Sequence, residues 1–186
     1  MPLDDILLEA EEAMDKATAH LNHELAGIRT GRASPALVEN VKVDYYGSPT
    51  DLKAIASITV PEATQLLIRP FSPGDTGAIK KAIETSNLGV APVVEDKQVR
   101  LNLPSMSTDR RKQLAAQAKK AGEAAKVSIR NARRDGNKAL DAEEKAKAMS
   151  EDEAKSGKDD VQKLTDRYEQ QVNDAIESKT NKIMEV

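Results

Sequence analysis

The first stretch of the chain repeats its apolar residues at steps of three and four. Between Leu3 and Ile28 these residues fall on one face of a helix, and charged or polar residues fill the other faces. Gly31 suits the end of a helix, and Pro35 cannot easily continue one. The pattern predicts a first long helix that ends before Pro35, with its buried face formed by Leu3, Leu7, Ala10, Met14, Ala17, Leu21, Leu25 and Ile28.

After Pro35 the helical period gives way to short β-type runs, which continue as far as Pro104. Strands are expected at residues 41–46, 55–60, 65–71 and 98–103, with a turn at residues 47–49. Pro70 interrupts one of these runs, because proline cannot donate to a strand ladder. A short helix is expected over residues 77–85, with Asp75 as its N-cap. These runs predict a small β/α insertion.

The remainder of the chain returns to helical periodicity in two long runs. Residues 108–148 predict one Ala-rich helix, with cap residues at its start and Gly136 as a weak point that costs about 1 kcal/mol relative to Ala. Ser150 and Glu153 have the spacing of a capping box, which predicts the start of a third helix. The expected apolar positions of the two helices are Leu114, Ala118, Ala121, Ala125, Ile129, Ala132 and Ala139, and then Val161, Leu164, Tyr168, Val172, Ile176 and Ile183.

Each predicted helix has one apolar stripe, and three such stripes can close around one core. The expected fold class is therefore α+β, an elongated antiparallel three-helix bundle (residues 1–30 and 106–186) with an inserted small β/α domain (residues 31–105). The chain passes between the two domains twice, through short connections that can act as a hinge. The expected hinge residues are Gly31, Arg32, Pro35, Pro104 and Ser105.

Basic residues are concentrated in one segment of a chain whose net charge is only −3. Residues 107–135 hold nine basic and three acidic side chains, which gives this segment a charge of +6. Its heptad-spaced residues lie about 100° around the helix from the apolar stripe, so they are expected to face solvent and to follow a phosphate backbone. The row consists of Lys112, Lys119, Lys126 and Arg133, with Arg130 and Arg134 beside its end.

The composition limits the kinds of RNA recognition and catalysis that the chain can support. Aromatic residues make up only 2% of the chain, which disfavours base stacking and favours recognition of the backbone and shape of folded RNA. The absence of cysteine excludes disulfides, thiolate nucleophiles and Cys-based zinc sites, and no nucleophile triad or phosphate-binding glycine loop is present. We therefore expect neither an enzyme nor a cofactor.

His20, His23 and Glu24 have a spacing at which imidazoles can meet a metal, but no further ligand of obvious spacing lies nearby, so solvated histidines and no metal are expected. No apolar run approaches the ~20 residues that span a bilayer, and the first residues lack the basic flank of a signal peptide. A cytoplasmic monomer without a membrane partner is expected.

Three other functions remain open from the residues alone, the first being another kind of RNA-binding protein that uses the basic row. The chain can be a coiled-coil scaffold for protein partners, with the basic row as a solubilising face. It can also be an enzyme of nucleic-acid metabolism, which the lack of a metal or nucleophile motif disfavours.

Several ordered motifs indicate a family. The chain resembles the ribosome recycling factors of bacteria and organelles along essentially its whole length. The motifs are residues 28–35 (IRTGRASP), 45–47 (YYG), 86–89 (SNLG), 109–112 (DRRK), 129–135 (IRNARRD) and 159–164 (DDVQKL).

This resemblance implies an L-shaped protein of transfer-RNA-like dimensions, whose helical bundle binds large-subunit ribosomal RNA in the post-termination complex. It implies that elongation factor G with GTP acts on the bound factor, so that the subunits separate and release mRNA. The resemblance also implies RNA contacts at Arg111, Arg130, Arg133 and Arg134, while Lys112, Lys119 and Lys126 are added from the basic row alone.

Overall fold

The computed structural model describes residues 2–185, and its contacts divide the chain into two compact units. The first unit consists of residues 2–25 and Ala116–Thr180, and the second of Ala26–Ala115 and residues 181–185. This division places the ends of the long helices in the second unit, whereas the predicted domains keep each helix whole. The predicted domain boundaries stay a prediction.

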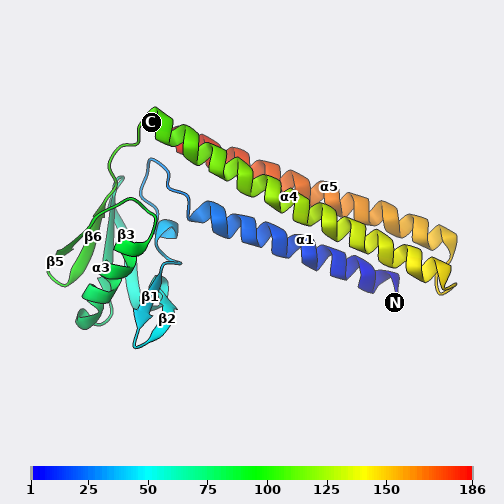
Figure 1. The fold of residues 1–186 in the computed structure, drawn as a ribbon, viewed down its shortest axis with the longest axis horizontal. Helices are drawn as coiled ribbons and strands as arrows, with labels where there is room; N and C mark the ends of the chain where they lie inside the picture. The colour runs from blue at the N-terminus through cyan, green and yellow to red at the C-terminus, as the bar shows by residue number, and fades with distance from the viewer. Residues whose placement is uncertain (1, 186) are drawn as a thin grey trace. The chain divides into compact units, whose positions relative to one another are not determined.

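Three long helices dominate the structure, as the apolar periodicity predicted: α1 (Leu3–Ala26), α4 (Thr108–Lys145) and α5 (Glu151–Met184). They run side by side (Figure 1). On α1 the buried face differs from the predicted one, because Ile6 and Thr18 are buried while Leu7 and Ala17 are only half-buried. A straight helix has 3.6 residues per turn, so its buried stripe drifts away from a strict heptad. Thr18 satisfies its hydroxyl by donating to Met14 O over 3.0 Å.

Glycines mark close approaches between the helices of the first unit. A Cβ atom added at Gly122 would lie 1.9 Å from Cδ1 of Ile176, so this side chain of α5 packs directly on the bare backbone of α4. At Gly136 the same atom would lie 3.5 Å from both Ala10 Cβ and Val161 Cγ2, which is ordinary contact with α1 and α5. Gly136 therefore lies where three helices meet, rather than at a break in α4.

The α4–α5 connection has well-defined caps at both helix ends. Helix α4 ends at Lys145, earlier than predicted, because Lys147 adopts φ +58° and Ala148 N–H donates to Glu143 O over 3.0 Å, as in a Schellman motif. The predicted capping box is confirmed. Ser150 N–H donates to Glu153 Oε2 over 2.9 Å, and Glu153 N–H donates back to Ser150 Oγ over 3.3 Å.

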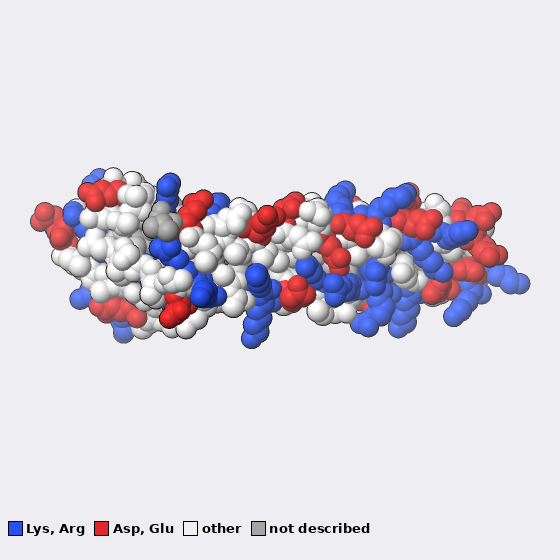
Figure 2. All heavy atoms as spheres, turned by 90° about the horizontal axis from the view of Figure 1, so that it is seen from above, with Lys and Arg blue, Asp and Glu red and all other residues white. Residues whose placement is uncertain are grey.

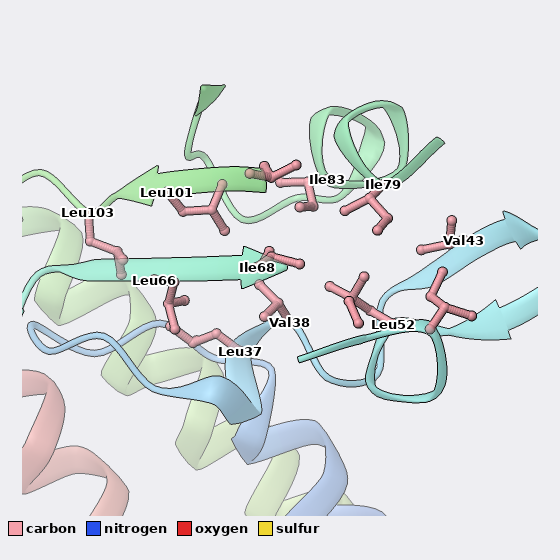
Figure 3. Packing of buried hydrophobic residues seen from close by; sticks show 13 residues of the cluster. Leu37, Val38, Val43, Leu52, Leu66, Ile68, Ile79, Ile83, Leu101 and Leu103 are labelled. Carbon is pink, nitrogen blue, oxygen red and sulfur yellow. The ribbon is translucent and has the colours of Figure 1, made fainter. Parts of the chain in front are cut away.

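The second unit contains a four-stranded antiparallel sheet in the order β3-β4-β6-β5 and a separate two-stranded hairpin. Residues from one face of the sheet pack against α3 and the segments before β3 (Figure 3). The elements are η1 (Pro35–Leu37), β1 (Lys42–Tyr45), β2 (Ser48–Asp51), α2 (Leu52–Ile55), β3 (Ala56–Glu62), β4 (Gln65–Pro70), η2 (Pro73–Asp75), α3 (Thr76–Thr85), β5 (Pro92–Glu95) and β6 (Gln98–Asn102).

Two strands and one cap differ from the prediction. Strands β2 and β5 were not expected, because each contains a proline, yet both pair along only one side, where a missing N–H is tolerated. Pro70 is likewise accommodated as the last residue of β4. Asp75 precedes α3 as predicted but makes no side-chain capping bond, and the Thr76 hydroxyl instead donates to Pro73 O over 2.9 Å.

Both connections that were predicted to form a hinge are anchored at the β3–β4 turn. Ala33 N–H donates to Ala63 O over 2.7 Å, and Leu103 N–H donates to Thr64 O over 2.8 Å. Arg29 joins the two connections, because its Nη2 donates to Pro104 O. Of the predicted hinge residues, Pro35 begins η1, while Gly31, Arg32, Pro104 and Ser105 lie outside every helix and strand.

Candidate nucleic-acid interface

The basic row on α4 is only partly exposed to solvent. Lys112 and Lys119 are exposed, as expected. The expectation is wrong for Lys126, whose side chain is only 18% exposed, and for Arg133, which is half-buried. Residues spaced by seven rotate by about 20° per heptad on a straight helix, so a row that starts on an open face reaches its edge within a few turns.

An open groove lies where this row reaches α5. Figure 2 shows basic side chains gathered along one side of the helices, over the half nearer the α4–α5 connection. Seven of the lining residues come from α4 and one comes from α5. We call this set the basic groove, and it consists of Arg130, Asn131, Arg133, Arg134, Asn137, Lys138, Asp141 and Gln162.

Hydrogen bonds hold the arginines of the basic groove in two different ways. Arg133 Nη1 donates to Gln162 Oε1 over 3.3 Å, and Arg134 Nη2 donates to Asn131 Oδ1 over 2.9 Å. Both acceptors are neutral amides, so they orient the guanidinium groups without cancelling their charge. Arg130 differs, because its Nε pairs with the Glu169 carboxylate over 3.0 Å. Arg133 and Arg134 therefore keep their charge where Arg130 is neutralised, and Lys138, exposed in the same groove, adds to the positive field.

Orientation without neutralisation suits an anion-binding surface. A guanidinium group can use its remaining N–H donors to bind two phosphate oxygens at once, and it stays charged at every physiological pH. An acid within the groove, Asp141, is paired with Lys158 over 2.6 Å, and hydrogen bonding to that lysine lowers the pKa of Asp141. The arrangement can hold a phosphate backbone but offers no evident nucleophile.

The structure brings only part of the predicted site together. Arg130, Arg133 and Arg134 line the basic groove, whereas Lys112, Lys119 and Lys126 do not. Arg111 belongs to the second unit, where its Nη1 donates to Met184 O over 3.4 Å. Their role in binding RNA remains a proposal for all seven residues.

Sequence reasoning missed five residues of the basic groove: Asn131, Asn137, Lys138, Asp141 and Gln162. Asn131 and Gln162 both lie inside motifs that carried the family resemblance, which was the available signal. Only the folded chain shows that Gln162 from α5 reaches Arg133 on α4. Asn137 lies outside these motifs, so the sequence offered no signal for it, and its buried Oδ1 has no hydrogen-bond partner among the described residues.

Two other expectations concern the rest of the chain. His20 and His23 are exposed on α1, and no cluster of potential metal ligands occurs within residues 2–185. None of the helices in this range is both long enough and apolar enough to cross a membrane.

Comparison with known proteins gives the same family as the sequence motifs. A family model described as "Ribosome recycling factor" matches residues 21–184. The chain belongs to the ribosome recycling factor family. The ribosome-recycling factor of Oleidesulfovibrio alaskensis is 45% identical over 184 residues, which cover 99% of this chain and 100% of that protein. That of Nitratidesulfovibrio vulgaris is 44% identical over 186 residues, covering 100% of both chains.

Solved structures of ribosome recycling factors share the fold. A solution structure of a ribosome recycling factor has a TM-score of 0.81 at 40% identity and covers 100% of this chain and 99% of its own. A second structure, with a TM-score of 0.71, 35% identity and full coverage of both chains, shows the T. thermophilus ribosome recycling factor and E. coli elongation factor G bound to the E. coli post-termination complex. The predicted α+β fold is therefore confirmed. Members of this family are non-catalytic factors, so the chain is not an enzyme.

Proposed function

We propose that this ribosome recycling factor binds the post-termination ribosome through large-subunit ribosomal RNA and, with elongation factor G and GTP, promotes subunit splitting and release from mRNA. The observation that carries the proposal is the basic groove, where Arg133 and Arg134 are held by neutral amides. Family membership supports ribosome recycling, and the groove supplies a means of attachment.

The basic groove favours recognition of the RNA backbone. Its oriented guanidinium groups match the geometry of phosphate oxygens, and no aromatic residue lines it for base stacking. We propose that Lys112 and Lys119, which are exposed on α4, add weaker, non-directional attraction, and that Lys126, mostly buried and paired with Glu123 over 3.2 Å, contributes least. Arg111, which is half-buried and donates to Met184 O, is proposed as an RNA contact from the family resemblance. The proposed contact is therefore sensitive to salt and to RNA shape, and insensitive to base identity.

The division of labour follows from the non-catalytic nature of the factor. The chemistry of GTP belongs to elongation factor G, which is the partner of a related factor on the post-termination complex. This chain contributes a surface that binds RNA and a second unit reached through Gly31, Arg32, Pro35, Pro104 and Ser105, which we propose as the hinge. We propose that the factor acts as a cytoplasmic monomer, without a cofactor or a membrane.

The decisive experiment compares Arg133→Ala with Lys16→Ala in binding to purified large ribosomal subunits over a range of salt concentrations. Losing one phosphate contact lowers the magnitude of the log K against log [salt] slope by roughly one unit. Lys16 is an exposed lysine of α1 outside the groove, 3.6 Å from Glu12, so its loss matches the change in charge without touching the groove. Equal slopes for wild type and Arg133→Ala would remove the groove from the binding mechanism.

A further inference from the structure

The hairpin β1–β2 closes with a two-residue loop that carries an unexpected residue. Tyr45 pairs with Ser48, so Tyr46 and Gly47 form the loop, with φ +51° and φ +81°. Positive φ at both positions is the signature of a type I′ turn, whose first position favours Asn, Asp or Gly. Tyrosine pays a steric cost there that glycine and asparagine avoid.

Packing does not explain this tyrosine. Tyr46 is 88% exposed, and the ring contact recorded for it is an edge-to-face approach to Tyr45 with 4.8 Å between centroids. A large aromatic side chain left in water gains little hydrophobic stabilisation. Tyr46 therefore combines an unfavourable backbone conformation with a side chain that contributes little to packing.

The hairpin β5–β6 shows how the same unit builds a similar turn elsewhere. Its two loop residues, Asp96 and Lys97, also have positive φ, at +44° and +66°. Aspartate suits the first position, and both side chains are polar. An exposed aromatic residue in a strained conformation is a frequent mark of a contact residue, and tyrosine is enriched where binding energy concentrates.

The charges near the loop favour a protein partner over RNA. Asp44 lies beside the loop, where its Oδ1 accepts a hydrogen bond from Gly47 N–H over 2.9 Å. The nearest cation on the same strand, Lys42, is paired with Asp51 over 2.7 Å. RNA phosphates approaching this loop would meet the carboxylate of Asp44, in contrast to the basic groove. A protein surface can instead take the ring into an apolar socket and bond the phenol.

We propose that Tyr46 is the side chain through which this factor contacts elongation factor G. The inference rests on the proposed function, in which elongation factor G is the one protein that must act on the bound factor. Through this contact the GTPase would bind the second unit, while α4 would bind the RNA.

The first test compares Tyr46→Asn and Tyr46→Phe with Lys97→Gly, which relieves a positive φ at the second loop position of the β5–β6 turn. Because asparagine and glycine relieve strain, both Tyr46→Asn and Lys97→Gly should raise Tm by about 2–4 °C. Tyr46→Asn should leave ribosome affinity unchanged and raise the concentration of elongation factor G for half-maximal splitting by at least about tenfold. Tyr46→Phe should recover most of this loss, and Lys97→Gly should split ribosomes like wild type.

The second test replaces Tyr46 with photoreactive p-benzoylphenylalanine in post-termination ribosomes with elongation factor G. A crosslink to elongation factor G supports the proposal, and a crosslink to rRNA or to a ribosomal protein overturns it. A lower Tm for Tyr46→Asn, or wild-type splitting by this variant, would also overturn it, since Tyr46 would then be structural or dispensable. If wild type itself fails to split ribosomes, the proposed function fails instead.

Discussion

Nη1 of Arg133 on α4 donates a hydrogen bond to Oε1 of Gln162 on α5 across 3.3 Å. This bond joins two helices through a charged donor and a neutral acceptor, so the arginine is oriented while its charge remains available. The neighbouring pair of Arg130 and Glu169 has a carboxylate acceptor instead. Replacing the amide of Gln162 by a carboxylate and the carboxylate of Glu169 by an amide should therefore have opposite effects on RNA binding.

Gln162→Glu should weaken binding to large ribosomal subunits. A carboxylate at this position would pair with Arg133 and cancel its charge, so the salt dependence should fall by about 0.7–0.9 units in the slope of log K against log [salt]. The hydrogen bond to Arg133 is retained, but Gln162 Nε2 also donates to Asp166 Oδ1 over 2.7 Å and this bond is lost, so a modest loss of stability with the fold preserved is expected. Binding measured at several KCl concentrations, with circular dichroism as the fold control, tests this. An unchanged slope would mean that Arg133 contacts no phosphate.

Glu169→Gln should have the reverse effect. The amide keeps a hydrogen-bond acceptor for Arg130 but no longer neutralises it, so affinity at low salt should rise and the slope should steepen by up to about one unit. The same binding titration measures both variants. Slopes that move in the same direction for Gln162→Glu and Glu169→Gln would contradict a mechanism based on charge.

The three long helices could be predicted from the sequence, because each has an apolar stripe that continues over many turns. The capping box could also be predicted, since Ser150 and Glu153, the partners of its hydrogen bonds, lie three residues apart. The end of α4 was less predictable, because Lys147 adopts a positive φ without being glycine. Strands β2 and β5 escaped notice because an edge strand tolerates proline that a central strand excludes.

Two glycines of α4 should respond oppositely to alanine. Gly136→Ala adds a methyl at ordinary contact distance from Ala10 and Val161, so it should raise stability by about 0.5–1 kcal/mol through helix propensity and chain entropy. Gly122→Ala places its methyl 1.9 Å from Ile176 Cδ1, which should lower stability by about 1–3 kcal/mol as the helices separate or Ile176 repacks. Urea denaturation of both variants measures the two signs. Similar changes at both positions would refute the close approach at Gly122.

The capping box predicts a pH dependence. Backbone and side-chain hydrogen bonds from Ser150 lower the pKa of Glu153. A lowered pKa in the folded state contributes stability that is present above the ordinary value of about 4.3 and is lost as pH falls through the folded value. Tm measured from pH 7 to pH 3 should therefore fall less for Glu153→Gln than for wild type. Glu151→Gln, which removes a carboxylate from the same turn but leaves the capping box, should behave like wild type. Parallel curves for wild type and Glu153→Gln would rule out this source of acid sensitivity.

Proline in the proposed hinge should separate binding from splitting. Gly31→Pro or Ser105→Pro restricts a connection that lies outside every helix and strand, so splitting with elongation factor G should fall more than ribosome affinity. Gly31→Ala is the control, because its methyl would lie 3.5 Å from Glu185 O without restricting φ to the proline range. An equal loss of binding and splitting would show that motion at these residues is not a separate step.

The basic groove could be predicted only in part. Arg130, Arg133 and Arg134 were visible as a charged cluster next to one another in the chain, and the family motifs supported them. Which of these arginines keep their charge depends on residues of another helix: Gln162 lies 29 residues after Arg133, and Glu169 lies 39 residues after Arg130. The heptad row was misleading for Lys126, because the row drifts around α4 and only the folded chain shows which face of the helix is covered.

The most direct test of the central claim is sucrose-gradient sedimentation of purified post-termination ribosomes with this factor, elongation factor G and GTP. The account predicts conversion of whole ribosomes into subunits only when all three are present, with Arg133→Ala shifting the required factor concentration upward and Lys16→Ala leaving it unchanged. Whole ribosomes that persist with all three components, or equal splitting by Arg133→Ala and wild type at limiting factor, would contradict it.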